Sequence, residues 1–123
     1  MVRTELYLFR EPKSDSIPFL QWLERQPPKV QTKCTLRIDR LGEIGHELRR
    51  PEADFLRDGI YELRASYQGV NYRILYFFAG QAIIVVSHGL IKDKKVPPGE
   101  IDLAIDRKKK VEGDFNRFTF RPE

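Results

Sequence analysis

Three runs of alternating apolar and polar residues occupy the middle of the chain, between residues 56 and 95. Gln68-Gly69 separates the first run from the second, and Ala79-Gly80 separates the second from the third. Two residues that include a glycine, placed between alternating runs, are typical of a tight hairpin. The pattern therefore predicts three consecutive antiparallel strands, and we expect the rest of the chain to pack on them.

The two turns also set the expected register of these strands. A two-residue loop at the first turn pairs Arg64 with Arg73, and the same count from the second turn pairs Asn71 with His88. Side chains of paired residues point to the same face of a sheet. One face is therefore expected to carry Glu62, Arg64, Asn71, Arg73 and His88, and the other Tyr61, Leu63, Ala65, Tyr72, Ile74, Tyr76, Ile83 and Val85. We expect helices to cover the second, apolar face.

The first face places two arginines opposite each other. Like charges in such a cross-strand pair are destabilising by up to about 1 kcal/mol. Two explanations are open: the carboxylate of Glu62 relieves the repulsion between Arg64 and Arg73, or the pair binds an anionic ligand.

The segments before these strands predict a strand and two helices. Residues 4–10 alternate and predict a strand that is buried on both faces or lies at the sheet edge. Apolar residues at helical spacing over 17–23 predict a short helix capped by one of residues 14–16. Pro27-Pro28 ends that helix, and a second one runs from Pro28 to Gly42 or Gly45. No periodicity is present over 43–57, and a loop is expected there.

After the strands the chain is basic up to Pro97-Pro98, where a last helix is expected to start with Ile101 and Ala104 inward. In the tail, about residues 113–123, Phe118 and Phe120 alternate with polar residues, which predicts that it folds back or adds a strand to a partner. The order β-α-α-β-β-β-α predicts one α+β domain over residues 1–123, a twisted, mostly antiparallel sheet packed on a helical hairpin with a C-terminal helix.

Composition narrows the class of protein further. With 41% hydrophobic and 33% charged residues, the 123-residue chain suits a folded globular domain. Its net charge of +4 and pI near 9.3 are compatible with nucleic-acid binding. The single cysteine, Cys34, excludes an internal disulfide and lies on an apolar helix stripe. No signal peptide or membrane span is visible, and we expect a cytoplasmic protein without membrane contact.

The candidate chemistry lies on the cationic face of the sheet. No phosphate-binding loop, nucleotide-binding glycine motif or zinc cluster is present, and we expect no cofactor and no metal. Arg64 and Arg73 can hold a phosphate, and a guanidinium suits the charge that develops during phosphoryl transfer. His88 titrates near neutral pH and suits a general base or acid, and Lys92 and Lys94 share its side of the strand. These groups are sufficient for metal-free RNA cleavage.

Residues around this face are expected to contact RNA. They are Lys95, Tyr67, whose ring can stack on a base, Arg49 and Arg50. A structural interpretation carries comparable weight: the two arginines can bind Glu62 or loop carbonyls, His88 can be a satisfied, partly buried residue, and the lysines can form a solvated surface.

Three segments resemble a known family. GIYELR at 59–64, YRILYF at 72–77 and HGLIKDKKVPPGEIDLA at 88–104 are similar to the phage-protein-like HigB branch of the RelE/ParE toxin superfamily. The resemblance implies the compact RelE-like fold and a type II toxin: a ribosome-dependent mRNA endonuclease that inhibits translation, uses the 2′-hydroxyl as nucleophile and needs no metal. By position it assigns the catalytic role to Arg64, Arg73, His88, Lys92 and Lys94.

The resemblance also implies partners. They are mRNA, the ribosome and a cognate antitoxin, typically a helix-turn-helix protein, with operator DNA reached only through that antitoxin. The chain departs from the family pattern in its tail, which lacks the C-terminal tyrosine of RelE, and at VPPGE, where a threonine is expected. The same fold supports ParE-like inhibitors of DNA gyrase, and an inactive relative that serves as an antitoxin or DNA-binding partner is a further alternative.

Overall fold

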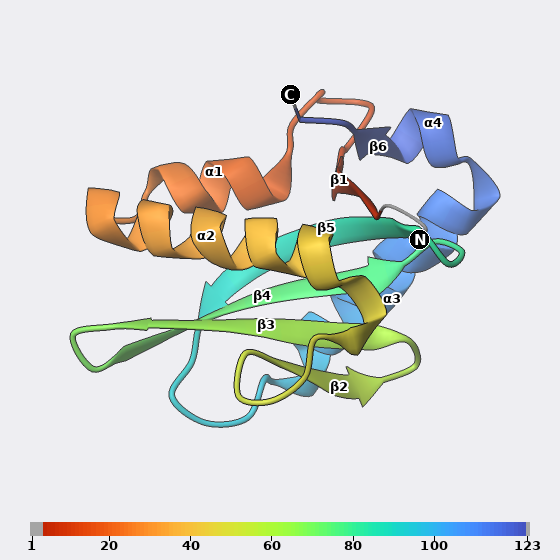
Figure 1. Ribbon diagram of the computed structural model, residues 1–123. Coiled ribbons are helices and arrows are strands. Elements are labelled where there is room, and N and C mark those ends of the chain that lie inside the picture. The colour runs from red at the N-terminus through yellow and green to blue at the C-terminus, as the bar shows by residue number, and fades with distance from the viewer. Residues whose placement is uncertain (1–3, 123) are drawn as a thin grey trace.

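The computed structural model describes residues 4–122 (Figure 1). Its elements in chain order are β1 (Glu5–Phe9), α1 (Pro18–Glu24), α2 (Pro28–Ile44), the 3-10 helix η1 (Gly45–Glu47), β2 (Ala53–Arg57), β3 (Ile60–Tyr67), β4 (Val70–Phe78), β5 (Ile83–Ile91), α3 (Pro98–Gly113), α4 (Phe115–Phe118) and β6 (Thr119–Phe120). The predicted α+β class is confirmed, and the architecture is compatible with a RelE-like fold.

One six-stranded sheet organises the molecule, in the order β2-β3-β4-β5-β1-β6. All neighbouring strands are antiparallel except β1 and β5, which are parallel. The helical hairpin of α1 and α2 covers one face, and α3 lies against the other (Figure 1). The cationic face is therefore not free along its whole length, because α3 buries part of it.

The two helices of the hairpin form largely as expected. Pro28 occupies the first turn of α2, where its missing N–H is not needed, and Val30, Cys34 and Leu41 are buried against the sheet. The helix ends where Gly45 takes a φ of 66°, a conformation that favours glycine. Two details were wrong: Gly42 lies inside the helix, and Ile17, not a residue of 14–16, is the N-cap of α1.

The stretch expected to be a loop before the central strands contains a strand. β2 pairs with the first half of β3, through contacts such as Ala53 with Leu63, after a turn at Asp58 and Gly59, both with positive φ. β2 is only five residues long, and three of them are apolar, so alternation alone does not reveal it. It becomes a strand because β3 offers an unpaired edge.

The first hairpin has the predicted register. Gln68 and Gly69 have φ values of 50° and 80°, which correspond to the type I′ turn that joins two-residue hairpins. Tyr67 pairs with Val70, and counting back places Arg64 opposite Arg73. The prediction of two opposed arginines is confirmed.

The second hairpin has a different register from the predicted one. Phe78 pairs with Ile84, so five residues, 79–83, separate the two and not the two residues of a tight turn, and the N–H of Ala79 donates to the carbonyl of Ile83. The register then shifts, since Leu75 pairs with His88 while Tyr76 pairs with Val86, which leaves Ser87 as a bulge.

The longer loop changes which face the first residues of β5 occupy. Val85 and Ile83 pack with α3, not with the helical hairpin as expected. The bulge restores the alternation after Ser87, so His88 does share a face with Arg73, but its strand partner is Leu75 and not Asn71.

The tail folds back on its own sheet. β6 pairs with β1 through Leu8 with Phe120 and Phe9 with Thr119. The ring of Phe118 stacks on Phe9, with centroids 6.1 Å apart. Of the two expectations for the tail, the structure supports the intramolecular one.

None of the helices found in residues 4–122 combines the length and the apolar composition that crossing a membrane requires.

Candidate functional site

A cleft of about 430 Å³ opens at the edge of β3, beyond the point where β2 begins opposite Leu63. It lies between the hairpin β3–β4, the loop before β2 and the side of α2. The residues that line it are Arg37, Pro51, Glu52, Arg64, Ala65, Ser66, Asn71 and Arg73. Both opposed arginines of the sheet therefore reach the same cavity.

The buried carboxylate of Glu62 holds the two arginines together. Its Oε1 accepts a hydrogen bond from Nε of Arg64 at 2.5 Å and from Nη1 of Arg73 at 2.7 Å. The Glu62 side chain is only 2% exposed, compared with 35% for Arg64 and 12% for Arg73. The repulsion expected between the arginines is thus relieved from inside the protein, while Arg64 remains accessible from the cleft.

Two more carboxylates extend this ionic network. Glu52 pairs with Arg37 and Arg40 of α2. Asp54 pairs with Arg50 at 2.7 Å and lies 3.4 Å from Arg64. The hydrogen bond from Arg50 holds the pKa of Asp54 below its usual value. Among residues 4–122, five guanidinium groups share three carboxylates in this network, so two positive charges are left unbalanced at the cleft.

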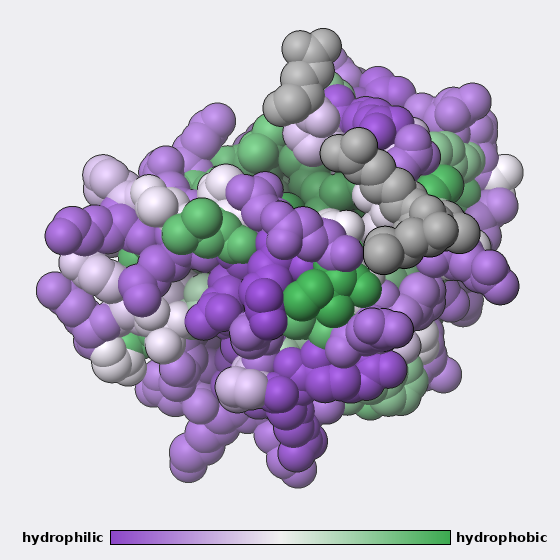
Figure 2. Space-filling model, in the orientation of Figure 1, coloured by the Kyte–Doolittle hydropathy of each residue, from purple (hydrophilic) through white to green (hydrophobic). Residues whose placement is uncertain are grey.

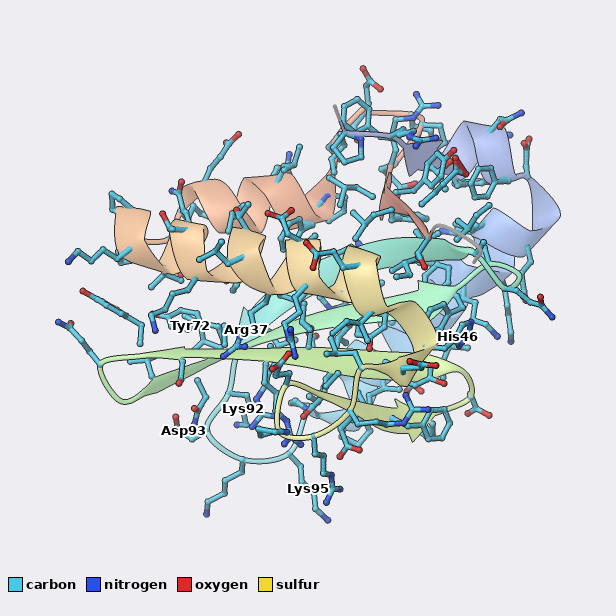
Figure 3. All side chains as sticks on the ribbon, in the orientation of Figure 1. Arg37, His46, Tyr72, Lys92, Asp93 and Lys95 are labelled. Carbon is cyan, nitrogen blue, oxygen red and sulfur yellow. The ribbon has the colours of Figure 1, made fainter. Side chains whose placement is uncertain are left out.

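A second group of cations lies beside the arginines, in the loop after β5. Lys92, Lys94 and Lys95 are exposed, and Arg73 donates from Nη2 to the carbonyl of Lys94 at 3.2 Å. In Figure 3 Arg37 extends from α2 towards β3, and Lys92 and Lys95 lie on the opposite side of that strand. The surface on the lower edge of this view is mostly hydrophilic (Figure 2).

His88 does not line the cleft. Its ring is 8% exposed, and it lies under the start of α3, where Nδ1 is 2.8 Å from Oγ of Ser87 and Nε2 is 3.3 Å from Oε1 of Glu100. Burial lowers the pKa of His88 below its usual value, and the nearby Arg107 lowers it further, against the opposing effect of Glu100. The geometry matches the structural interpretation of this histidine.

The residues predicted to contact RNA are divided between two regions. Tyr67 packs against the helical-hairpin core, and Nζ of Lys33 lies 5.9 Å from its ring centroid. Arg50 joins the cleft network through Asp54. Arg49 instead donates to the carbonyls of His46 and Leu48 and does not line the cleft.

Sequence reasoning missed two residues of the cleft, Arg37 and Glu52. Arg37 is one of the charged residues of a helix, and Glu52 lies in a segment without periodicity. Their approach to Arg64 depends on the packing of α2 over the sheet edge, for which the chain carries no local signal. Within residues 4–122, no three histidine, cysteine or acidic side chains cluster as metal ligands would.

Comparison with known proteins adds one match. The family model described as Phage derived protein Gp49-like (DUF891) matches residues 21–109, which include the whole cleft and the lysine loop. That family is associated with toxin–antitoxin systems and is related to RelE-like toxins. A search of curated protein sequences finds no significant match.

Proposed function

The chain belongs to the phage-derived Gp49-like protein family, and we propose that it acts as the toxin of a type II toxin–antitoxin system, a ribosome-dependent endonuclease that cuts mRNA. Within the superfamily we place it in the HigB branch, on the motifs at residues 59–64, 72–77 and 88–104. The proposed partners are mRNA in the ribosome and a cognate antitoxin, which would link the protein to operator DNA.

The observation that carries this proposal is the surplus of two positive charges at the cleft, with Arg64 accessible and Arg73 held beside it. A phosphodiester carries one negative charge, and the pentavalent state formed during cleavage carries about one more. A preorganised cationic site stabilises the second state more than the first, which is the condition for catalysis.

In the proposed reaction the 2′-oxygen attacks the adjacent phosphorus, and the bond from phosphorus to the 5′-oxygen breaks. The leaving 5′-oxygen takes a proton from water, so the products are a 2′,3′-cyclic phosphate and a 5′-hydroxyl. Arg64 would bind the non-bridging oxygens. Glu52 lines the cleft, pairs with Arg37 and Arg40, and is our candidate to accept the proton of the 2′-hydroxyl.

Lys92, Lys94 and Lys95 would contact the phosphates next to the cut. Lysine side chains bind the RNA backbone without reading the sequence, which suits an enzyme whose substrate is presented by the ribosome. We assign no catalytic role to His88, because its ring is buried under α3.

The test is primer extension on an mRNA in a cell-free translation extract. The purified protein should produce cuts in phase with codons, and Arg64→Ala should weaken them at least tenfold. Arg121→Ala, which removes an exposed arginine paired with Glu5, is the matched control and should cut like the wild type. Intact mRNA during normal translation would exclude the proposal.

A second candidate is a non-catalytic inhibitor of DNA gyrase, and the burial of His88 favours it, since the cleft then lacks a group that titrates near neutral pH. It predicts that the protein blocks DNA supercoiling by purified gyrase and that it leaves mRNA intact. Replacing Arg64 by Lys should then cost little, because charge alone would suffice for binding.

A further inference from the structure

We propose that Glu62 is a positioning residue, whose carboxylate sets the geometry of both arginines and, through Arg73, of the lysine loop. The inference rests on the proposed function, because it assigns these side chains to the binding of the scissile phosphate. Glu62 itself is 2% exposed and cannot touch an RNA that enters the cleft.

The two arginines share one hydrogen-bond acceptor. A single oxygen, Oε1 of Glu62, accepts from Nε of Arg64 and from Nη1 of Arg73 at 2.5 and 2.7 Å. Both hydrogen bonds are charge-assisted and lie in a region that is shielded from water, which makes them strong. This one oxygen of a β3 side chain therefore sets the distance between the two guanidinium groups.

The same carboxylate also orients Arg64. Its Nε–H faces inward to Glu62, and its Nη2 lies 3.4 Å from Asp54. Among residues 4–122, Nη1 has no hydrogen-bond partner, and the side chain lines the cleft. Binding Nε thus leaves the outer edge of the guanidinium for a phosphate oxygen, and removes the rotational freedom that an exposed arginine normally has.

Arg73 links the same carboxylate to the lysines. Arg73 donates to Glu62 from Nη1 and to the carbonyl of Lys94 from Nη2, at 2.7 and 3.2 Å. The loop is also joined to the sheet by the N–H of Lys92, which donates to the carbonyl of Asn71 at 3.1 Å. A change at Glu62 is therefore transmitted through Arg73 to the position of Lys94.

The charge of Glu62 matters as well as its shape. A glutamine would keep an oxygen acceptor, but two guanidinium groups would then face each other with no negative charge between them. We expect the more exposed Arg64 to turn away into solvent, because it is the group with access to water.

The test compares Glu62→Gln, Arg64→Ala and the double variant in single-turnover cleavage of mRNA on programmed ribosomes. We expect Glu62→Gln to lower the cleavage rate at saturation about 10- to 100-fold, with less than about a threefold change in half-saturating concentration. The double variant should lose less than the product of the two single losses, because the part of the Glu62 effect that passes through Arg64 is already lost in Arg64→Ala. Multiplicative losses, or wild-type cleavage by Glu62→Gln, would overturn the assignment.

A carboxylate variant elsewhere provides the control. Glu5 accepts from Arg121 at 2.7 Å, and Glu5→Gln removes the same charge from a pair outside the cleft. It should cut like the wild type. Should Glu62→Gln unfold, Arg73→Lys tests the same chain of contacts, because lysine keeps the charge but cannot bridge Glu62 and the Lys94 carbonyl, and it should lower the rate at least tenfold.

A second measurement does not depend on cleavage. The Nε–H proton of Arg64 should exchange slowly with water in the wild type and in Glu5→Gln, and fast in Glu62→Gln, as seen by nitrogen-15 NMR. Fast exchange in the wild type would overturn the positioning role. Absence of cleavage by a wild type with a slowly exchanging Arg64 proton would overturn the proposed function alone.

Discussion

Arg64 and Arg73 lie directly opposite each other on neighbouring strands, although both are positively charged. Such a pair costs up to about 1 kcal/mol when nothing compensates it. Here the compensation is a buried carboxylate, which is itself costly to remove from water unless it is paired. The Glu62 carboxylate and the two guanidinium groups thus stabilise one another. The guanidinium of Arg64 remains accessible at the cleft.

The first prediction separates the geometry of Arg64 from its charge. Arg64→Ala should lower the cleavage rate at saturation about 10²- to 10³-fold, the usual cost of removing one donor that stabilises a developing charge. Arg64→Lys should recover only part of that loss, because lysine lacks the fork of N–H groups that bonds Glu62 and a phosphate together. The rates of mRNA cleavage on ribosomes measure both effects.

Equal rates for Arg64→Lys and the wild type would show that charge alone is needed, as the gyrase-inhibitor alternative requires. Arg121→Lys is the control for the chemical change, since this arginine is also paired with a glutamate.

The second prediction concerns His88 and the pH dependence of folding. The pKa of His88 is lowered in the folded state by burial and by Arg107. The unfolded chain therefore binds a proton more readily, and the free energy of unfolding should fall as the pH drops below about 6.5, with a slope of up to about 1.4 kcal/mol per pH unit. Above that pH the histidine is neutral in both states and contributes no slope.

Urea unfolding between pH 5 and pH 8 measures this dependence. His88→Gln, which can still hydrogen bond but does not titrate, should reduce the slope between pH 5 and 6.5. His46→Gln changes an exposed histidine that stacks on Phe78, and should keep the wild-type slope. The same slope in all three proteins would contradict the assignment to His88.

The third prediction concerns the lysine loop. Replacing Lys92, Lys94 and Lys95 by Gln should weaken binding of a single-stranded RNA oligonucleotide and make it less sensitive to salt. Each lost phosphate contact should reduce the log–log salt slope by about 0.7. Fluorescence anisotropy at several salt concentrations measures this.

The matched control replaces Lys108, Lys109 and Lys110 of α3, which changes the net charge equally. Two of these lysines form ion pairs within their own helix, Lys108 with Glu112 and Lys110 with Asp106. An equal loss in both triple variants would mean that only net charge matters, not the position of the loop.

The fourth prediction tests how the helical hairpin is seated on the sheet. A methyl group added at Gly89 of β5 would overlap the indole of Trp22 in α1. Gly89→Ala should therefore lower the free energy of unfolding by about 1–3 kcal/mol, the usual cost of overpacking. Gly99→Ala, at a glycine in α3 with no neighbouring atom within 4 Å, should be neutral or slightly stabilising. Equal stability of both variants would refute this contact.

The first hairpin could be predicted from the sequence because its register depends on two adjacent residues, Gln68 and Gly69, that adopt one turn type. The second could not. Gly80 has the same positive φ, but it lies in a longer loop between the paired residues Phe78 and Ile84, and no local pattern indicates that loop length or the bulge at Ser87. The face predicted for Val85 was wrong because of the longer loop.

The cleft was predictable only in part. Arg64 and Arg73 come from one hairpin, so counting along it brought them together. Arg37 and Glu52 come from a helix and a loop, and they reach the cleft through tertiary packing that periodicity does not encode. His88 was predicted on the correct face, but α3 covers it, and the position of that helix could not be read from the strands.

The most direct test of the central claim uses ribosomes programmed with an mRNA that carries one 2′-deoxynucleotide at the position of the cut. If the cationic cleft promotes attack by the 2′-oxygen, the wild type should cut the all-ribose mRNA to a 2′,3′-cyclic phosphate and a 5′-hydroxyl. The deoxy-substituted message should remain intact at that position, and Arg64→Ala should slow cutting of the first. Cutting of both messages at equal rates, or of neither, would contradict the claim.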